Sequence, residues 1–162
     1  MLAEQFARGA REAGHEPEIL DVAYENVHPC TGCVACGYEG TCVQKDGMTA
    51  IRQQLLSADM VVFATPLYYF GMSAQLKSVV DRFCAFSHSL RARHLKSALI
   101  AVAWDDYDWT FEALESHYRT LLRYIDLEDR GILLAGGCGT PAETADSEHL
   151  RRAYEFGKSL KE

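Results

Sequence analysis

Three short apolar runs divide the chain, at residues 60–64 (MVVFA), 98–103 (ALIAVA) and 131–137 (GILLAGG). Each run is unbroken and is bounded by turn or polar residues, a pattern typical of strands that are covered on both faces in a parallel sheet. Residues 18–22 (EILDV) form a weaker candidate for a fourth strand. The pattern therefore predicts a small sheet with helices on both of its sides.

Stretches with helical periodicity separate these runs, at 1–13, 46–57, 75–86, 109–125 and 148–160. In the first stretch Leu2, Phe6 and Ala10 recur at four-residue spacing, and Gly14 stands where a helix C-terminal cap belongs. Alternating strands and helices imply right-handed βαβ crossovers. We expect an α/β fold, a three-layer sandwich around a parallel sheet, in one domain that covers residues 1–162.

Composition narrows the function classes. A chain of 162 residues that is 48% hydrophobic is long enough for one ordinary core. Its formal charge of −7 argues against a nucleic-acid or anionic-membrane surface, because phosphate binding needs clustered Lys and Arg. No run reaches the roughly 20 apolar residues of a bilayer span, and no basic segment precedes an apolar one at the start. We expect a cytoplasmic protein.

A cysteine-rich segment lies between the first two helical stretches. Its spacing is C-x2-C-x2-C-x5-C, formed by Cys30, Cys33, Cys36 and Cys42, and nearby glycines allow tight wrapping of the backbone. Convergent thiolates suit zinc or an iron-sulfur cluster, and successive three-residue steps are closer to ferredoxin-type runs than to zinc knuckles. A metal centre, a reduced cluster without metal and a disulfide framework all stay open. Cys84 and Cys138 receive no role.

Open parallel sheets bind ligands beyond the carboxyl ends of their strands, which draws attention to the loop after the first apolar run. There Thr65 and Pro66 end the strand, and large flat or polarizable side chains follow at Leu67, Tyr68, Tyr69, Phe70 and Met72, with Gly71 among them. These side chains suit a planar aromatic cofactor. Packing of the loop itself is the alternative, and spacing does not decide between the two.

The other two loops at this edge carry weaker signals. The segment AWDDYDW supplies Trp104 and Tyr107 beside three aspartates, of which Asp105 follows Trp104 directly. The segment GGCGTPAET is flexible enough for close backbone approach but lacks the spacing of a phosphate fingerprint. Lys77, Asp81 and Arg82 are expected to form a solvated helix face with a structural salt bridge.

Two motifs together, PCTGCVAC with GTCVQKDGM and ATPLYYFGMSAQLKSVVDRF, resemble the NAD(P)H-dependent, FMN-binding reductases of flavodoxin-like fold, in particular their iron-sulfur flavoprotein branch. The resemblance implies that residues 66–72 lie along the isoalloxazine ring and that Trp104 and Asp105 belong to a neighbouring cofactor-facing loop. It implies a [4Fe-4S] centre on Cys30, Cys33, Cys36 and Cys42. It also implies a homodimer or homotetramer.

The resemblance contains one departure. The family opens with a central strand and a turn that holds the FMN phosphate at the start of the first helix, and this chain begins after that turn. We therefore expect a flavodoxin-like sheet without its usual first strand and phosphate loop, truncated at the N-terminus relative to the family. The gap is then closed by upstream residues, by the sheet itself or by a neighbouring chain.

Three functions follow. The first is an FMN-dependent oxidoreductase that moves electrons from NADH, NADPH or ferredoxin to an unidentified small-molecule or protein acceptor. Hydride transfer demands no acid/base side chain, so no catalytic residue is assigned. The second is electron transfer between partner proteins without substrate turnover. The third is a non-catalytic scaffold whose cysteines bind zinc or no metal.

Overall fold

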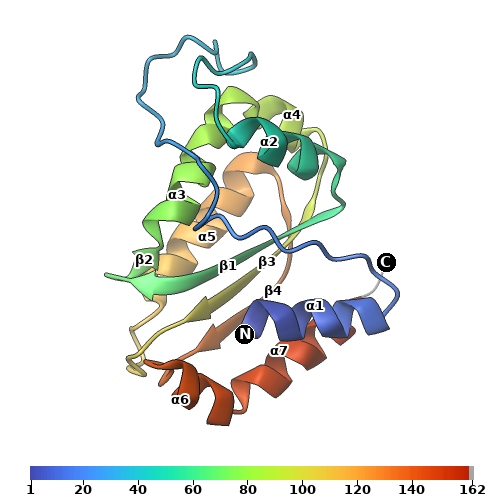
Figure 1. The fold of residues 1–162 in the computed structure, drawn as a ribbon, viewed down its shortest axis with the longest axis vertical. Coiled ribbons are helices and arrows are strands. Elements are labelled where there is room, and N and C mark those ends of the chain that lie inside the picture. Colours follow the sequence, from blue (N-terminus) through green and yellow to red (C-terminus); the bar gives the residue numbers. More distant parts are fainter. Residues whose placement is uncertain (161–162) are drawn as a thin grey trace.

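The computed structural model describes residues 1–160 and contains one four-stranded sheet in the order β2-β1-β3-β4 (Figure 1). The strands are β1 (Met60–Tyr68), β2 (Gly71–Met72), β3 (Lys96–Val102) and β4 (Glu128–Ala135). β1, β3 and β4 are parallel, and β2 is a short antiparallel partner of β1. The three strands predicted from apolar runs are confirmed.

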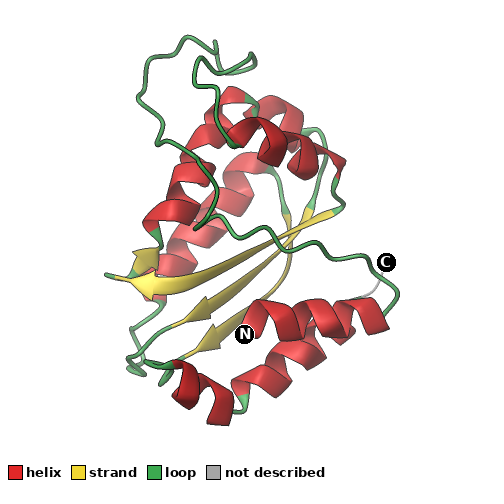
Figure 2. Ribbon diagram, in the orientation of Figure 1, coloured by secondary structure: helices red, strands yellow, loops and turns green. Residues whose placement is uncertain are grey.

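Helices cover both faces of this sheet (Figure 2). α1 (Leu2–Glu12) and α7 (His149–Lys158) lie on one face, near the short α6 (Pro141–Asp146). The other face carries α3 (Ala74–Asp81), the 3-10 turn η1 (Arg82–Ala85) and α5 (Glu112–Ile125), with α2 (Met48–Ser57) and α4 (Ser87–Arg91) at its end. All five predicted helices are present. The short elements α4, α6 and β2 lay outside the sequence prediction.

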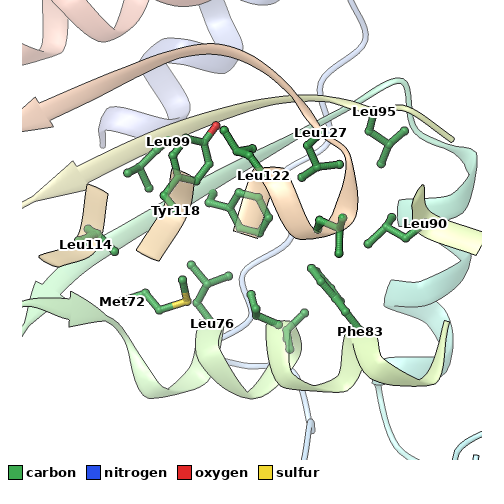
Figure 3. Packing of buried hydrophobic residues seen from close by; sticks show 14 of the residues in the cluster. Met72, Leu76, Phe83, Leu90, Leu95, Leu99, Leu114, Tyr118, Leu122 and Leu127 are labelled. Carbon is green, nitrogen blue, oxygen red and sulfur yellow. The ribbon is translucent and has the colours of Figure 1, made fainter. Parts of the chain in front are cut away.

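The strands alternate between two apolar layers. Leu99 of β3 faces the larger core with α3 and α5, whereas its neighbour Ile100 faces the smaller core with α1 and α7. Figure 3 shows the larger core, in which Leu76, Phe83 and Tyr118 pack together. Because each strand is apolar on both faces, its sequence is an unbroken apolar run, as a covered parallel sheet requires.

α1 and α7 approach each other through two glycines. A Cβ atom added at Gly9 would meet the backbone of Tyr154, and one added at Gly157 would meet the backbone of Phe6. The two helices therefore pack backbone against backbone at this crossing. After α1, Gly14 has a φ of 93° and closes the helix as predicted.

The segment at 18–22 is not a strand, which corrects the prediction. His15–Val22 instead forms one wall of a groove of about 580 Å³, whose other walls are α1, α2, α3 and residues 60–64 of β1. A strand needs a ladder partner, and the groove separates this segment from the edge of β1. Within residues 1–160, no strand pairs with that edge before Leu67. No helix among these residues has the length and hydropathy to cross a membrane.

Candidate functional site

An exposed aromatic turn follows β1. β1 and β2 form a hairpin in which Tyr68 pairs with Gly71, so Tyr69 and Phe70 are its two loop residues. Their φ angles are 47° and 65°, the sign that a type I′ turn requires and that side chains other than Gly, Asn and Asp seldom adopt. The exposed fractions are 61% at Tyr68, 100% at Tyr69 and 40% at Phe70. The turn thus holds its rings out of the core.

The base of this turn is rigid. The Thr65 hydroxyl accepts a hydrogen bond from the Ser73 amide at 2.9 Å and donates one to the Pro66 carbonyl at 2.8 Å. The Ser73 hydroxyl in turn accepts from the Leu76 amide and caps α3. Met72 is buried in the core beneath the turn. Thr65 and Met72 therefore position the turn. The aromatic rings of the turn form its exposed face.

Two further loops meet the turn at the same edge of the sheet. Phe70 contacts Trp109, with ring centroids 5.3 Å apart, and Trp109 stacks on Tyr107 at 5.6 Å with an interplanar angle of 3°. Trp104 is 77% exposed and packs over Gly139, where a Cβ atom would collide with the indole. The aromatic surface of this site therefore comes from the ends of β1 and β3, and glycine after β4 makes room for it.

Asp105 is also exposed in this loop, beside Gly136. The structure thus brings Tyr68, Tyr69 and Phe70 to one sheet edge with Trp104 and Asp105, the residues expected from the sequence. Trp109 was not among the expected site residues. The only sequence signal for it was its place in the aromatic segment after β3.

The cysteine-rich segment forms a loop with a closed base. The side chains of Arg82 and Asp46 are 2% and 1% exposed and form an ion pair at 2.8 Å. The same guanidinium donates to the His28 carbonyl at 2.8 Å, and the Asp46 carboxylate accepts from the His28 amide at 3.0 Å. Gln44 adds a hydrogen bond to the Pro29 carbonyl at 3.0 Å. We call residues 26–29 and 44–47, which face each other here, the neck.

The four thiols of this loop do not converge. Within residues 1–160, no group of three or more His, Cys, Asp and Glu side chains is placed to hold a metal ion. Cys30 lies against Cys84 of η1, with their sulfur atoms 3.8 Å apart, and Cys36 interacts with the same thiol. Cys42 instead interacts with Arg82. The loop contains enough thiols for a cluster but does not assemble them in this conformation.

Cys84 of η1 and Cys33 of the loop have shifted pKa values. Burial, followed by the neighbouring thiols of Cys30 and Cys36, raises the pKa of Cys84 to about 12. The Ala35 amide and then the Thr31 side chain hydrogen-bond to Cys33 and lower its pKa below the ordinary value, and Cys33 is exposed.

The fold and the aromatic edge define a flavodoxin-like α/β protein. A family model described as NADPH-dependent FMN reductase matches residues 1–129, and the chain belongs to this family. An NAD(P)H:quinone oxidoreductase from Methanothermobacter marburgensis has the same fold, with a TM-score of 0.78 and 18% identity over 99% of this chain and 87% of that one.

Among curated relatives, the chain is similar to an iron-sulfur flavoprotein of Archaeoglobus fulgidus, with 26% identity over 152 residues, 93% of this chain and 66% of that protein. An iron-sulfur flavoprotein of Methanosarcina thermophila is 37% identical over 73 residues, 45% of this chain and 38% of that protein. The chain therefore spans two thirds or less of the length of these relatives.

Proposed function

We propose that this protein is an FMN-dependent oxidoreductase that passes electrons from reduced nicotinamide or ferredoxin to a further acceptor. The observation that carries the proposal is the exposed aromatic turn at the carboxyl end of β1, joined by Trp104 and Trp109 at the same edge. Membership of the FMN reductase family supports it. When bound, FMN supplies the chemistry of accepting a hydride and releasing electrons singly or in pairs.

The residues of the turn fit a flat ring. Tyr69 and Phe70 are held outward by left-handed backbone, which costs roughly 1–2 kcal/mol at each residue and is a conformation found more often at ligand sites than elsewhere. The rings of Tyr68 and Trp104 are exposed and can stack on the ligand, and the Phe70 amide supplies a donor for its polar edge. These residues bind and orient the cofactor, and no side chain is assigned a proton transfer.

The N-terminus of α1 is the proposed binding site for the FMN phosphate. This helix begins at the end of the sheet where β3 and β4 finish, and no side chain caps its first amides (Figure 1). Free amides and the helix dipole favour phosphate. The expected result is that FMN binds roughly two- to thirty-fold more tightly than riboflavin. Equal affinities would remove α1 from the binding site.

Reconstitution with FMN tests the proposal as a whole. Flavin fluorescence should be quenched on binding, and Tyr69→Ala, Phe70→Ala and Trp104→Ala should each weaken FMN binding about two- to ten-fold through lost stacking. Tyr24→Ala is the matched control, because Tyr24 is also exposed but lies outside the site. Failure of the full chain to take up FMN, or equal binding by all variants, would overturn the assignment.

We also propose that Cys30, Cys33, Cys36 and Cys42 hold an iron-sulfur cluster once their loop rearranges. The support is the presence of four thiols on one closed loop and the names of the relatives. Iron and sulfide analysis of anaerobically prepared protein should find stoichiometric amounts that Cys33→Ser removes and Cys138→Ser leaves. Zinc alone, or no metal, would instead favour a scaffold.

The remaining parts of the proposal are the cellular setting and the assembly. Six free cysteines suit a reducing compartment, which supports a cytoplasmic location. We propose a homodimer or homotetramer, which light scattering of the purified protein tests. Steady-state NAD(P)H oxidation with small acceptors distinguishes an enzyme from an electron carrier that only serves partner proteins.

A further inference from the structure

Cys84 has no part in the flavin site, yet its sulfur atom lies against that of Cys30. Their sulfur atoms are 3.8 Å apart although the residues are separated by 54 positions in the sequence. It is the only thiol–thiol hydrogen bond among the described residues. The contact joins the cysteine-rich loop to η1.

The neck fixes the two cysteines opposite each other. Arg82, two residues before Cys84 in η1, donates to the His28 carbonyl two residues before Cys30. Gln44 holds the Pro29 carbonyl next to Cys30 at 3.0 Å. Arg82 therefore ties η1 to the loop two residues before each thiol, and Gln44 holds the loop backbone beside Cys30. The proximity of the sulfurs is a property of a hydrogen-bonded framework and not of a loose chain.

The two thiols differ in their access to solvent. Cys30 is exposed, whereas Cys84 is partly buried between the loop and the core. A disulfide needs a sulfur–sulfur distance near 2.0 Å, so the pair has to close by roughly 1.8 Å. Side-chain rotation together with a small shift of the irregular loop covers such a distance. A small oxidant reaches Cys30 first, and Cys84 is poised behind it.

We propose that Cys30 and Cys84 form a reversible dithiol–disulfide site, which goes beyond the proposed flavin function. With a small-molecule disulfide such as oxidised glutathione, the Cys30 thiolate attacks one sulfur, forms a mixed disulfide and releases one glutathione thiolate. Cys84 then loses its proton and attacks the Cys30 sulfur, which releases the second glutathione. Two protein thiols are oxidised, and one glutathione disulfide is reduced to two thiols.

This bond and a metal centre on the loop exclude each other. Cys30 cannot be a metal thiolate while its sulfur is bonded to Cys84. Oxidation therefore locks the loop onto η1 and withdraws one of the four expected ligands. The site links the redox state of the surrounding thiol pool to the capacity of the loop to bind metal.

Peptide mapping tests the site. The full-length protein is freed of metal with chelator and fully reduced, equilibrated with glutathione buffers of increasing oxidation, alkylated and digested with trypsin. Residues 83–91, which carry Cys84, should appear linked to the peptide that carries Cys30. Cys30→Ser and Cys84→Ser should each lower this linked species more than tenfold. Cys138→Ser is the control, because Cys138 is buried away from the other thiols.

Other linkages would overturn the proposal. A Cys33→Ser or Cys36→Ser variant that loses the linked species, while Cys30→Ser keeps it, would place the bond on another cysteine. Oxidation confined to pairs within residues 30–42, with Cys84 alkylated equally before and after, would show that the contact is not reactive. Differential alkylation of the wild-type protein measures the reactivity of Cys84 before and after oxidation without any variant. FMN binding, measured on the same samples, reports separately on the flavin site.

Discussion

Arg82 and Asp46 are 36 positions apart in the sequence, and their side chains form an ion pair with 2% and 1% exposure. The pair has two hydrogen bonds between its members, at 2.8 and 3.2 Å, and further partners at both the amide and the carbonyl of His28. Arg82 thus bridges the two segments of the neck. A buried pair that satisfies this many partners fixes where the cysteine-rich loop leaves the core.

Arg82→Met should destabilise the protein strongly. The change leaves Asp46 buried without its counter-ion, which typically costs about 3–5 kcal/mol. Urea unfolding at neutral pH measures the loss. Lys77→Met in α3 is the control, since Lys77 and Asp81 are both more than 40% exposed and such pairs contribute about 0–1 kcal/mol. Similar losses in the two variants would contradict the structural role given to the buried pair.

Acid should weaken the same neck. Burial by itself would raise the pKa of Asp46, but hydrogen bonds from Arg82 and from the His28 and Met48 amides hold this pKa below its ordinary value of 3.8. The folded state therefore binds the proton more weakly than the unfolded state. The stabilisation is complete above pH 3.8 and is lost as the pH falls through the lower, folded value.

Unfolding free energies measured from neutral pH down to pH 3 check this. The wild-type curve should fall more steeply at the acid end than that of Asp46→Asn, which has no carboxylate to protonate. Parallel curves for the two proteins would show that Asp46 is not the group responsible.

Tyr118 should limit stability at alkaline pH. Its hydroxyl donates to Ser97 at 3.1 Å inside the larger core. Burial, partly offset by this hydrogen bond, raises the pKa of Tyr118 to about 12 from 10.0. Because the folded pKa is the higher one, the stabilisation is present below pH 10 and is lost as the pH rises towards 12.

Ultraviolet titration of the phenol, compared with Tyr118→Phe, measures this directly. The wild-type protein should contain one tyrosine that ionises late, and the variant should lack it. The variant should also be about 1 kcal/mol less stable at neutral pH, because Ser97 loses a buried partner. A titration in which every tyrosine ionises near its ordinary pKa would refute the burial of this hydroxyl.

Gly157→Ala should separate α7 from α1. The added Cβ would overlap the Phe6 carbonyl, a backbone atom that cannot rotate away. Overpacking of this kind costs about 1–3 kcal/mol, and thermal unfolding should show it. Gly71→Ala is the control, since its nearest neighbour would be at 3.8 Å, an ordinary contact. Equal stabilities would mean that the two helices are not in backbone contact.

Amide exchange should distinguish β1 from β3. β3 is paired on both sides along most of its length, whereas the outer edge of residues 60–64 faces the groove. Amides of β1 that point towards the groove should exchange faster than those of β3. They exchange through local opening, which requires less free energy than the unfolding that exposes a central strand. Hydrogen exchange followed by mass spectrometry measures this for each strand. Equal protection would indicate that the groove edge is covered in solution.

The sequence predicted the sheet because both faces of its strands are buried. β1, β3 and β4 alternate between two apolar cores, and this produces unbroken apolar runs that periodicity detects. Residues 18–22 also contain three aliphatic residues but lack a neighbouring strand, and composition alone does not report pairing. The prediction of a strand there was wrong for that reason.

The candidate site was predictable in part. Exposure of Tyr69 and Phe70 follows from their place after a buried strand, although the left-handed turn that presents them has no glycine at those positions. A salt bridge was expected for Lys77, Asp81 and Arg82, and it holds between Lys77 and Asp81. The partner of Arg82 is distant in sequence, as is the thiol neighbour of Cys84. Such contacts depend on tertiary structure and leave no local pattern.

The neck has a consequence for how this protein tolerates change. Its two segments, residues 26–29 and 44–47, contact each other and Arg82 at the base of the cysteine-rich loop. Insertions between positions 31 and 35, where every residue is exposed, should therefore leave the sheet and its aromatic edge undisturbed. This exposed part of the cysteine-rich segment is therefore exchangeable, and a graft that keeps these anchor points can replace it with other ligands.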